Sequence, residues 1–409
     1  MATRTSARSG RNSANLLVLL LGTAVLLNYI DRGAIGIAAP VMTRELKLSP
    51  QAYGLVFSAF FWVYAPVQLF SGWLCDRFSV YKLMAAGILI WAASTLLTGV
   101  ASGVISLLIL RIMLGVGESI SFPGSTKIIA RHVGPEKRGA ANAFLAMGIA
   151  LGPAIGTLAG GLMLASWGWR AMFVVFGTVT LLWLAPWLSA VRRLTPEELT
   201  EAGAAVPLRA LTGRWSLWSM AIVHCLGNYC FYFLLAWLPS FLVKSRGFSI
   251  GEMTLLATIG YAVQAVCAFS FGRFSDWWTG SGRSEGFCRR WLMVASQTAA
   301  AVAILGLSFA HSAIAIALLL CVAGAASAAL SMNLYAVGQM FSGSRAAGTW
   351  MGFQNALGNS SGIFGPILTG FIVQRAGYDT AFIVTALIAA VGAVWWAWGV
   401  PRIEQIELD

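Results

Sequence analysis

Apolar stretches of about twenty residues or more recur along this chain, and their length limits the folds that are open to it. An α-helix rises about 1.5 Å per residue, so about twenty apolar residues cross the roughly 30 Å hydrocarbon core of a bilayer. Little chain remains between these stretches, so no separate catalytic or nucleic-acid-binding module is expected. The pattern predicts an all-α integral membrane protein with twelve transmembrane helices, at residues 14–42, 51–73, 81–100, 104–132, 138–165, 168–190, 215–243, 249–277, 289–309, 313–341, 346–374 and 378–400.

The composition agrees with a chain that lies in a lipid bilayer. Hydrophobic residues make up 58% of it and charged residues only 10%, far below the roughly 25% that is usual in soluble domains. The six cysteines show no C-x-x-C spacing and the three histidines are scattered. Neither a disulfide framework nor a metal site is therefore predicted, and no cofactor is expected apart from a coupling proton.

The formal charge of +12 indicates topology better than it indicates a nucleic-acid partner. If the N-terminus is cytoplasmic, nineteen of the 27 lysines and arginines fall on cytoplasmic segments and six fall on the opposite side. Arg32 and Arg111 remain inside the membrane. Because cytoplasmic loops carry an excess of Lys and Arg, both termini are predicted to be cytoplasmic, and the first helix is expected to be retained.

The chain also repeats itself at an offset of 200 residues. Gly72 to Ser79, with the sequence GWLCDRFS, closes the second apolar stretch, and Gly272 to Asp276, with the sequence GRFSD, closes the eighth. A duplication of six helices with the same orientation implies two bundles related by a pseudo-two-fold axis along the membrane normal, with the binding site between them near the midplane. The bundles are predicted at 1–190 and 215–409, joined by a cytoplasmic linker at 191–214.

Four charged residues lie at membrane depth, where a charge costs about 2.5–3.5 kcal/mol on insertion scales. Asp31 and Arg32 fall in the first stretch, and Arg111 and Glu118 in the fourth. Seven residues are close to two helical turns, so Arg111 and Glu118 share one face about 10.5 Å apart along the axis and need a third group to connect them. Asp31 is expected to bridge to Arg111.

Adjacent helical residues point about 100° apart, so Arg32 is expected to point away from the fourth stretch when Asp31 faces it. Its predicted direction is the central cavity, where a guanidinium matches a carboxylate in two parallel hydrogen bonds. Three structural alternatives stay open: an Asp31–Arg111 pair that only ties the bundle together, a snorkelling Arg32, and an Asn355 that only joins helices.

Several motifs together resemble the major facilitator superfamily, and within it the anion:cation symporter branch of bacterial sugar-acid carriers and vesicular glutamate and sialin carriers. The segment G-x-x-x-D-R after the second stretch is similar to the superfamily's loop motif. The branch resemblance rests on NYIDR at 28–32, FSAFFWVY at 57–64, the segment from Arg111 to Pro123, and LAWLP at 235–239.

This resemblance implies roles for individual residues. It implies proton coupling by Asp31 and Glu118 together with Arg111, and it makes Arg32 the ligand of the substrate carboxylate. Some carriers of this branch have a polar amide in the fifth helix where this chain has Ile149, which leaves room for a less hydroxylated anion. The remaining implied residues are Tyr29, Tyr64 and Asn355 on the substrate-facing wall, and Gly72, Asp76, Arg77 and Asp276 in gating.

The predicted function is proton-coupled import of a small organic anion across the inner membrane by a monomer, with alternating access. The anion is a sugar acid, such as an aldonate or hexuronate, or another small carboxylate. Protonated Glu118 can donate to a substrate oxygen and repels the anion once it is ionised, so proton and anion load together. The alternative is a proton-coupled antiporter that exports drugs or metabolites, which needs no carboxylate-binding arginine; Arg32 counts against it and Ile149 counts for it. No enzyme is predicted.

Overall fold

The protein is a bundle of long helices, and no strand occurs in the part of the chain that is described. The computed structural model describes residues 2–133, 135–192, 194 and 208–406, with the side chains of 2–13, 72, 73, 76, 130, 135–140, 143, 276, 344, 345 and 347 excepted. The helices are α1 (Ala2–Glu45), α2 (Pro50–Arg77), α3 (Val80–Thr98), α4 (Val104–Glu118), α5 (Ser121–His132), α6 (Pro135–Leu182), α7 (Leu184–Val191), η2 (Leu208–Ala210), α8 (Trp215–Ser240), η3 (Phe241–Ser245), α9 (Ile250–Gly280), α10 (Glu285–Phe309), α11 (Ala313–Asn359), α12 (Ser361–Val394) and η4 (Trp395–Gly399).

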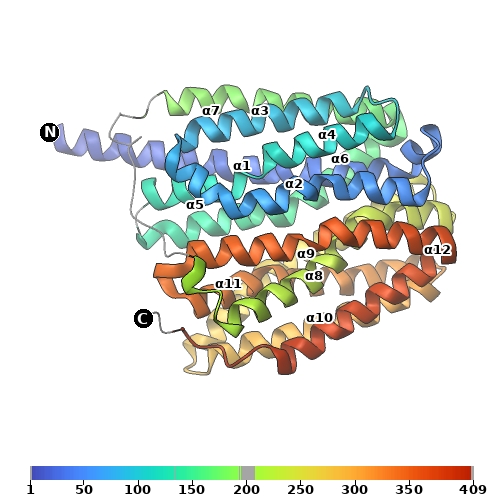
Figure 1. Cartoon of the computed structure of the whole chain (residues 1–409). Coiled ribbons are helices and arrows are strands. Elements are labelled where there is room, and N and C mark those ends of the chain that lie inside the picture. The colour runs from blue at the N-terminus through green and yellow to red at the C-terminus, as the bar shows by residue number, and fades with distance from the viewer. Residues whose placement is uncertain (1, 134, 193, 195–207, 407–409) are drawn as a thin grey trace.

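The helices run side by side and form two groups along the bundle. Helices α1–α7 lie on one side and α8–α12 on the other (Figure 1). The two marked chain ends lie at the same end of the bundle, which we call the terminal end, and the α1–α2 turn at residues 46–49 lies at the opposite end, the turn end (Figure 1). The predicted bundle limits at 190 and 215 fall close to the last residue of α7, Val191, and at the first residue of α8, Trp215. The division into domains stays a prediction.

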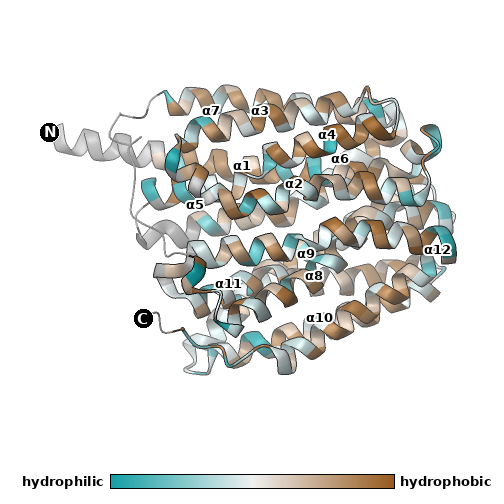
Figure 2. Cartoon of the chain, in the orientation of Figure 1, coloured by the Kyte–Doolittle hydropathy of each residue, from teal (hydrophilic) through white to brown (hydrophobic). Residues whose placement is uncertain are grey.

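Apolar side chains cover the outside of the bundle as well as its core. Figure 2 shows hydrophobic residues along the length of the helices, with hydrophilic residues gathered near the helix ends. Ile105, Ile314 and Trp398 are each at least 75% exposed, a pattern that is stable only against lipid. In a bilayer every backbone N–H and C=O must be paired within the chain, and an α-helix pairs them within its own segment. The chain is therefore a multi-pass membrane protein.

Ten helical stretches are long and apolar enough to cross a membrane, against the twelve predicted. The two longest, Phe144–Val191 with 48 residues and Gly348–Gly399 with 52, would each extend more than twice the thickness of the hydrocarbon core if they were straight. Each contains a glycine where the backbone leaves the helical conformation, Gly168 at φ 80° and Gly377 at φ 81°. Such a positive φ suits glycine, which has no Cβ. The count of twelve stays a prediction.

The helices α2 and α9 begin in the same way, 200 residues apart. The hydroxyl of Ser49 accepts a hydrogen bond from the backbone N–H of Ala52 at 3.1 Å, and that of Ser249 accepts one from Glu252 N–H at 3.2 Å. Both serines have extended backbone, as N-cap residues do. These caps fix the start of both helices at the turn end.

At the turn end the two groups of helices pack closely against each other. A Cβ added to Gly36 in α1 would lie 2.1 Å from the carbonyl oxygen of Leu235 in α8, and one added to Gly54 in α2 would lie 2.2 Å from that of Pro366 in α12. Only residues without a side chain allow backbones to approach this closely. The contact between the two groups is therefore closed at the turn end.

Candidate functional site

Four buried charged side chains lie on α1 and α4, within the group α1–α7. Asp31 is 1% exposed, Arg32 2%, Arg111 3% and Glu118 1%. Their burial was predicted from the sequence and is confirmed. A buried charge without a partner is strongly unfavourable, so the contacts of these four groups decide what the site does.

Arg32 and Glu118 form an ion pair that is hidden from solvent. The Nη2 of Arg32 lies 2.7 Å from Oε2 of Glu118, and its Nε lies 3.1 Å from the same oxygen. Arg32 Nη2 also donates to Oδ1 of Asn28 at 3.0 Å. The Nη1 of Arg32 makes no hydrogen bond to any described residue, and Oε1 of Glu118 is buried without a partner. The pair therefore retains one donor and one acceptor for another group.

Aromatic rings enclose the guanidinium of Arg32. Its Cζ lies 5.0 Å from the ring centre of Tyr29, 4.9 Å from that of Phe60 and 4.6 Å from that of Tyr64. Ring faces attract a cation, most strongly where water is excluded. The structure thus places Tyr29 and Tyr64, both predicted substrate-binding residues, beside Arg32, and it adds Phe60 and Asn28.

Asp31 has other partners than predicted. Its Oδ2 accepts hydrogen bonds from the indole N–H of Trp91 at 2.6 Å and from the hydroxyl of Thr180 at 2.9 Å, while its Oδ1 is buried without a partner. No bond joins Asp31 to Arg111 in the described part of the chain, so the expected Asp31–Arg111 bridge is wrong.

The physical reason is the rotation of α1 about its axis. Adjacent residues point about 100° apart, so only one of Asp31 and Arg32 can face α4. Arg32 faces it and meets Glu118, whereas Asp31 faces α3 and α6, which supply Trp91 and Thr180. The prediction that Arg32 points away from α4 is therefore also wrong.

Arg111 is a buried cation for which no described residue provides an ion pair. Its Nε and Nη2 have no hydrogen-bond partner, and its Cζ lies 5.4 Å from the ring centre of Phe57 and 5.2 Å from that of Phe60. The predicted role of Arg111 in proton coupling stays a prediction. Its guanidinium lies against ring faces, and two of its nitrogen atoms keep their N–H groups without a partner.

Neutral polar groups of α8 and α11 form a cluster that sequence reasoning missed. The hydroxyl of Tyr232 donates to Oδ1 of Asn359 at 2.6 Å, and Nδ2 of Asn228 donates to the same oxygen at 3.2 Å. Asn355, a predicted substrate-binding residue, lies one turn from Asn359, and its Oδ1 is buried without a partner. The spacing of Asn228 and Tyr232, four residues apart within an apolar run, is the sequence signal that could have revealed this cluster.

The gating residues predicted from the loop motif are mostly outside the described side chains. Gly72, Asp76 and Asp276 belong to the residues whose side chains are not described, and Arg77 is the last residue of α2. Their roles stay predictions. The turn end shows two further contacts between the groups of helices: Tyr53 Oη donates to the carbonyl oxygen of Ala236 at 2.8 Å, and Lys244 Nζ donates to Oγ1 of Thr43 at 2.6 Å.

Within the described residues, no group of three or more His, Cys, Asp or Glu side chains could hold a metal ion. The buried acids are separated instead: Glu118 lies with Arg32, and Asp31 with Trp91 and Thr180. The arrangement suits proton and anion binding, because each carboxylate keeps one oxygen without a hydrogen bond.

Comparison with known proteins identifies relatives over nearly the whole chain. The family model described as Major Facilitator Superfamily matches residues 21–284 and 284–406. A probable sulfoacetate transporter of Cupriavidus necator is 29% identical over 92% of this chain and 92% of its own length. The hexuronate transporter of Bacillus subtilis is 28% identical, also over 92% of both chains. A probable galactarate/D-glucarate transporter of Escherichia coli is 26% identical over 98% of both.

Among solved structures, a bacterial homologue of the human lysosomal transporter Spinster, in an inward-facing and unoccupied conformation, has a TM-score of 0.80 to this chain. The two sequences are 19% identical, and the match covers 96% of this chain and 98% of the other. At this identity the likeness establishes the fold alone.

Proposed function

This chain belongs to the Major Facilitator Superfamily, and from that premise we propose that it is a proton-coupled symporter that imports a small organic anion. The chain is a membrane transporter and not an enzyme. We propose a sugar acid or another small carboxylate as substrate, because relatives that match over most of their length are named as carriers of hexuronate, galactarate or D-glucarate, and sulfoacetate. The observation that carries the proposal is the buried Arg32–Glu118 pair.

The proposed architecture has twelve spans in two six-helix bundles related by a pseudo-two-fold axis, in a monomer of the inner membrane. The breaks at Gly168 and Gly377 support a division of each of the two longest stretches into two spans. The matching caps at Ser49 and Ser249 support the repeat. Both marked chain ends lie at one end of the bundle (Figure 1), and the excess of Lys and Arg on that side supports a cytoplasmic location for it.

Anion binding and proton binding are coupled through competition for Arg32. In the structure Glu118 occupies two donors of Arg32, at 2.7 and 3.1 Å. A substrate carboxylate needs the same donors, because a guanidinium binds carboxylates through a fork of parallel N–H groups. A proton on Glu118 removes its negative charge and weakens its hold on Arg32. Arg32 is then available to the anion, so the two ligands load together.

Asp31 provides the second proton site of the proposal. Trp91 and Thr180 both donate to its Oδ2, which leaves Oδ1 as the oxygen that can carry a proton. These two donors come from α3 and α6, and Asp31 itself lies on α1 beside Arg32. A change of charge at Asp31 can therefore alter how α1, which carries Arg32, packs against α3 and α6.

Coupled transport requires that only one end of the bundle is open at a time. The turn end is closed through the bonds from Tyr53 to Ala236 and from Lys244 to Thr43. Opening this end must break both bonds and separate the backbones at Gly36. The proposed gating by Gly72, Asp76, Arg77 and Asp276 concerns the terminal end.

The test is the internal pH of proteoliposomes after gluconate, glucuronate, glucarate or sulfoacetate is added outside. Symport predicts internal acidification by at least one anion, loss of the signal in Arg32→Ala, and an unchanged signal in the control Arg402→Ala, whose side chain is 88% exposed. If no anion acidifies the lumen and cationic drugs change its pH instead, the protein is the antiporter. The names of the relatives do not favour that alternative.

A further inference from the structure

The carboxylates at the turn end are all engaged by other groups. Three of them lie there among the described residues. Glu45 pairs with Arg170, with 3.0 Å between Oε1 and Nη1. Asp379 pairs with Arg246 at 2.7 Å. The third, Glu252, accepts a hydrogen bond from the backbone N–H of the N-cap residue of α9 at 2.8 Å. No carboxylate at this end is therefore left for a further cation.

Cations outnumber these carboxylates. Six lysines and arginines belong to the turn end, and Arg44, Lys47, Lys244 and Arg375 form no ion pair with a described residue. The guanidinium of Arg375 lies over the ring of Phe371, 4.4 Å from its centre. Unpaired positive charge of this kind raises the local concentration of anions.

Two of the unpaired cations meet where α1 contacts α8 and its continuation η3. Lys244 lies in η3, and its Nζ donates to Oγ1 of Thr43 in α1 at 2.6 Å. Arg44, the next residue of α1, lies close enough to repel this ammonium. Both side chains are exposed, so an anion in solution can reach them. The closed turn end therefore holds two cations from the two groups of helices beside each other.

This arrangement leaves both charges without compensation. Like charges repel, and the bond from Lys244 to Thr43 keeps the ammonium near Arg44. A lysine ammonium has three N–H donors, and two of those on Lys244 have no partner among the described residues. An anion between the two side chains would neutralise the repulsion and accept these donors. The pair is therefore suited to bind an anion.

The contact between α1 and α8 leads from this pair toward Arg32. Gly36 follows Arg32 by four residues and Thr43 follows it by eleven, which are close to one and three helical turns, so the three share one face of α1. Gly36 packs against Leu235 of α8, and Thr43 binds Lys244. Eleven residues span about 16 Å along the axis. Opening of this contact thus separates the two cations along the helix face that carries Arg32.

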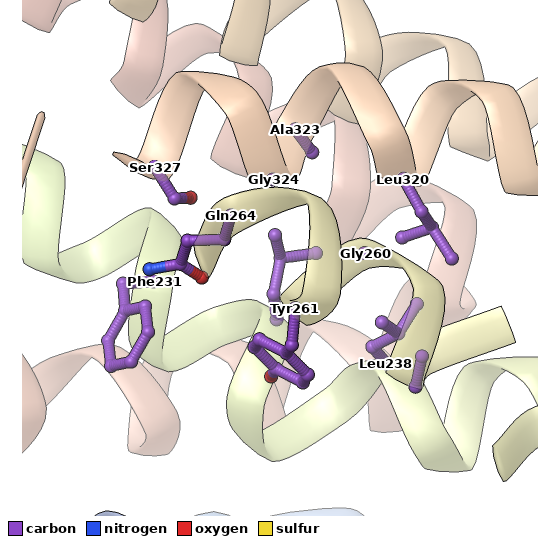
Figure 3. A pocket seen from close by; sticks show the side chains of 11 residues that line it. Phe231, Leu238, Gly260, Tyr261, Gln264, Leu320, Ala323, Gly324 and Ser327 are labelled. Atoms are coloured by element: carbon purple, nitrogen blue, oxygen red, sulfur yellow. The ribbon is translucent and has the colours of Figure 1, made fainter. Parts of the chain in front are cut away.

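The pocket between α8, α9 and α11 offers an anion no comparable site. All the residues that line it are uncharged, as Figure 3 shows for those that it labels. A carboxylate that enters such surroundings loses its hydration and gains no opposite charge. The distribution of charge therefore favours the pair of Arg44 and Lys244.

We propose that Arg44 and Lys244 form a capture site at the turn end, where the transported anion binds before it reaches Arg32. The inference rests on the proposed function. The ligand is a small anion whose carboxylate or sulfonate oxygens accept hydrogen bonds from both cations. Inorganic phosphate shares this chemistry, and the experiment separates the two. The two cations take no part in the proton step, so they act on kcat/KM and leave kcat unchanged.

The first measurement is the rate at which an amine-reactive reagent labels Lys244 in the purified full-length chain, followed by peptide mass spectrometry. Bound glucuronate or sulfoacetate shields the amine, so labelling is expected to slow about fivefold at four times the dissociation constant. Lys82, an exposed lysine of α3, is expected to react at an unchanged rate. Arg44→Gln is expected to remove most of the protection of Lys244.

Two further variants serve as controls for this measurement. Arg375→Gln removes the same charge from the same end, away from Lys244, and is expected to keep the protection, because Arg375 lies over Phe371. Arg32→Ala is also expected to keep it, because capture precedes binding at Arg32. The protection thus reports on the capture site independently of transport.

The second measurement is kcat/KM for uptake of radiolabelled glucuronate into proteoliposomes at two ionic strengths. Steering by charges is screened by salt, so wild-type kcat/KM is expected to be about tenfold higher at about 0.01 M than at about 0.15 M potassium chloride. Arg44→Gln is expected to reduce this ratio to about threefold without changing kcat. Arg375→Gln is expected to behave as the wild type.

Several outcomes would overturn the inference. Equal protection of Lys244 in Arg44→Gln and the wild type would do so, as would an equal loss in Arg375→Gln, because the overall charge of the turn end would then act. Protection by phosphate and not by glucuronate or sulfoacetate would assign the pair to an ion of the medium. Failure of the proposed function is distinct: glucuronate uptake would then persist in Arg32→Ala, whatever happens at Lys244.

Discussion

Replacing Glu118 by glutamine is expected to tighten anion binding, although it removes half of a buried ion pair. In the wild type both close contacts of Arg32 with Glu118, at 2.7 and 3.1 Å, must be broken before an anion can take their place. Breaking a buried pair by removing one partner costs about 3–5 kcal/mol, because the other charge remains uncompensated. The rings of Tyr29, Phe60 and Tyr64 still stabilise the cation, so we take the lower value.

An anion that binds to the Glu118→Gln variant regains this lost stabilisation. About 3 kcal/mol corresponds to roughly a hundredfold in affinity. The gain is expected at alkaline pH, where ionised Glu118 of the wild type competes for Arg32. It disappears at acid pH, where the wild-type carboxyl is protonated and resembles the amide. Wild-type affinity therefore falls as the pH rises, and the affinity of the variant changes much less.

The assay is calorimetric titration of gluconate or glucuronate into the purified protein between pH 5 and pH 9. The control is Glu285→Gln, which breaks the partly exposed Arg289–Glu285 pair, also at 2.7 Å; surface pairs contribute about 0–1 kcal/mol, so no change in anion affinity is expected. Weaker binding by Glu118→Gln at pH 9, or a wild-type affinity that does not depend on pH, would refute the competition between Glu118 and the anion.

Two further variants test the anion site and the closed turn end. Arg32→Lys keeps the charge but loses the planar fork, so the KM of transport is expected to rise about tenfold in a radiolabelled uptake assay; an unchanged KM would show that Arg32 acts only as a point charge. Gly36→Ala places a Cβ 2.1 Å from the carbonyl oxygen of Leu235 and is expected to lower cross-linking between α1 and α8 at the turn end. The control is Gly103→Ala, whose added Cβ has no atom within 4 Å and which is expected to leave the cross-linking unchanged. Equal cross-linking in both variants would contradict the closure at Gly36.

The sequence predicted the helical bundle and the buried charges because both follow from one-dimensional patterns. Lengths of apolar runs set the helices, and an acid or a base inside such a run has to be buried. The pairing of the charges was predicted wrongly, because it depends on how α1 is rotated about its axis. A rotation of about 100° exchanges the directions of Asp31 and Arg32, and nothing in the local sequence determines that angle.

Neutral partners were missed for a different reason. Trp91 and Thr180 are compatible with any transmembrane helix, so the sequence does not indicate that they bind Asp31. The cluster of Asn228, Tyr232 and Asn359 joins residues more than 120 positions apart, on two helices. Such clusters depend on the packing of distant segments.

We propose that protons drive the movement of the anion through the buried acids. The direct measurement is accumulation of radiolabelled gluconate or glucuronate in proteoliposomes with an imposed pH gradient, alkaline inside. Symport predicts that the wild type concentrates the anion above its outside level, and that Asp31→Asn still exchanges the anion across the membrane without concentrating it. Anion uptake that only equilibrates in the wild type, or accumulation that persists in Asp31→Asn, would contradict proton coupling through Asp31.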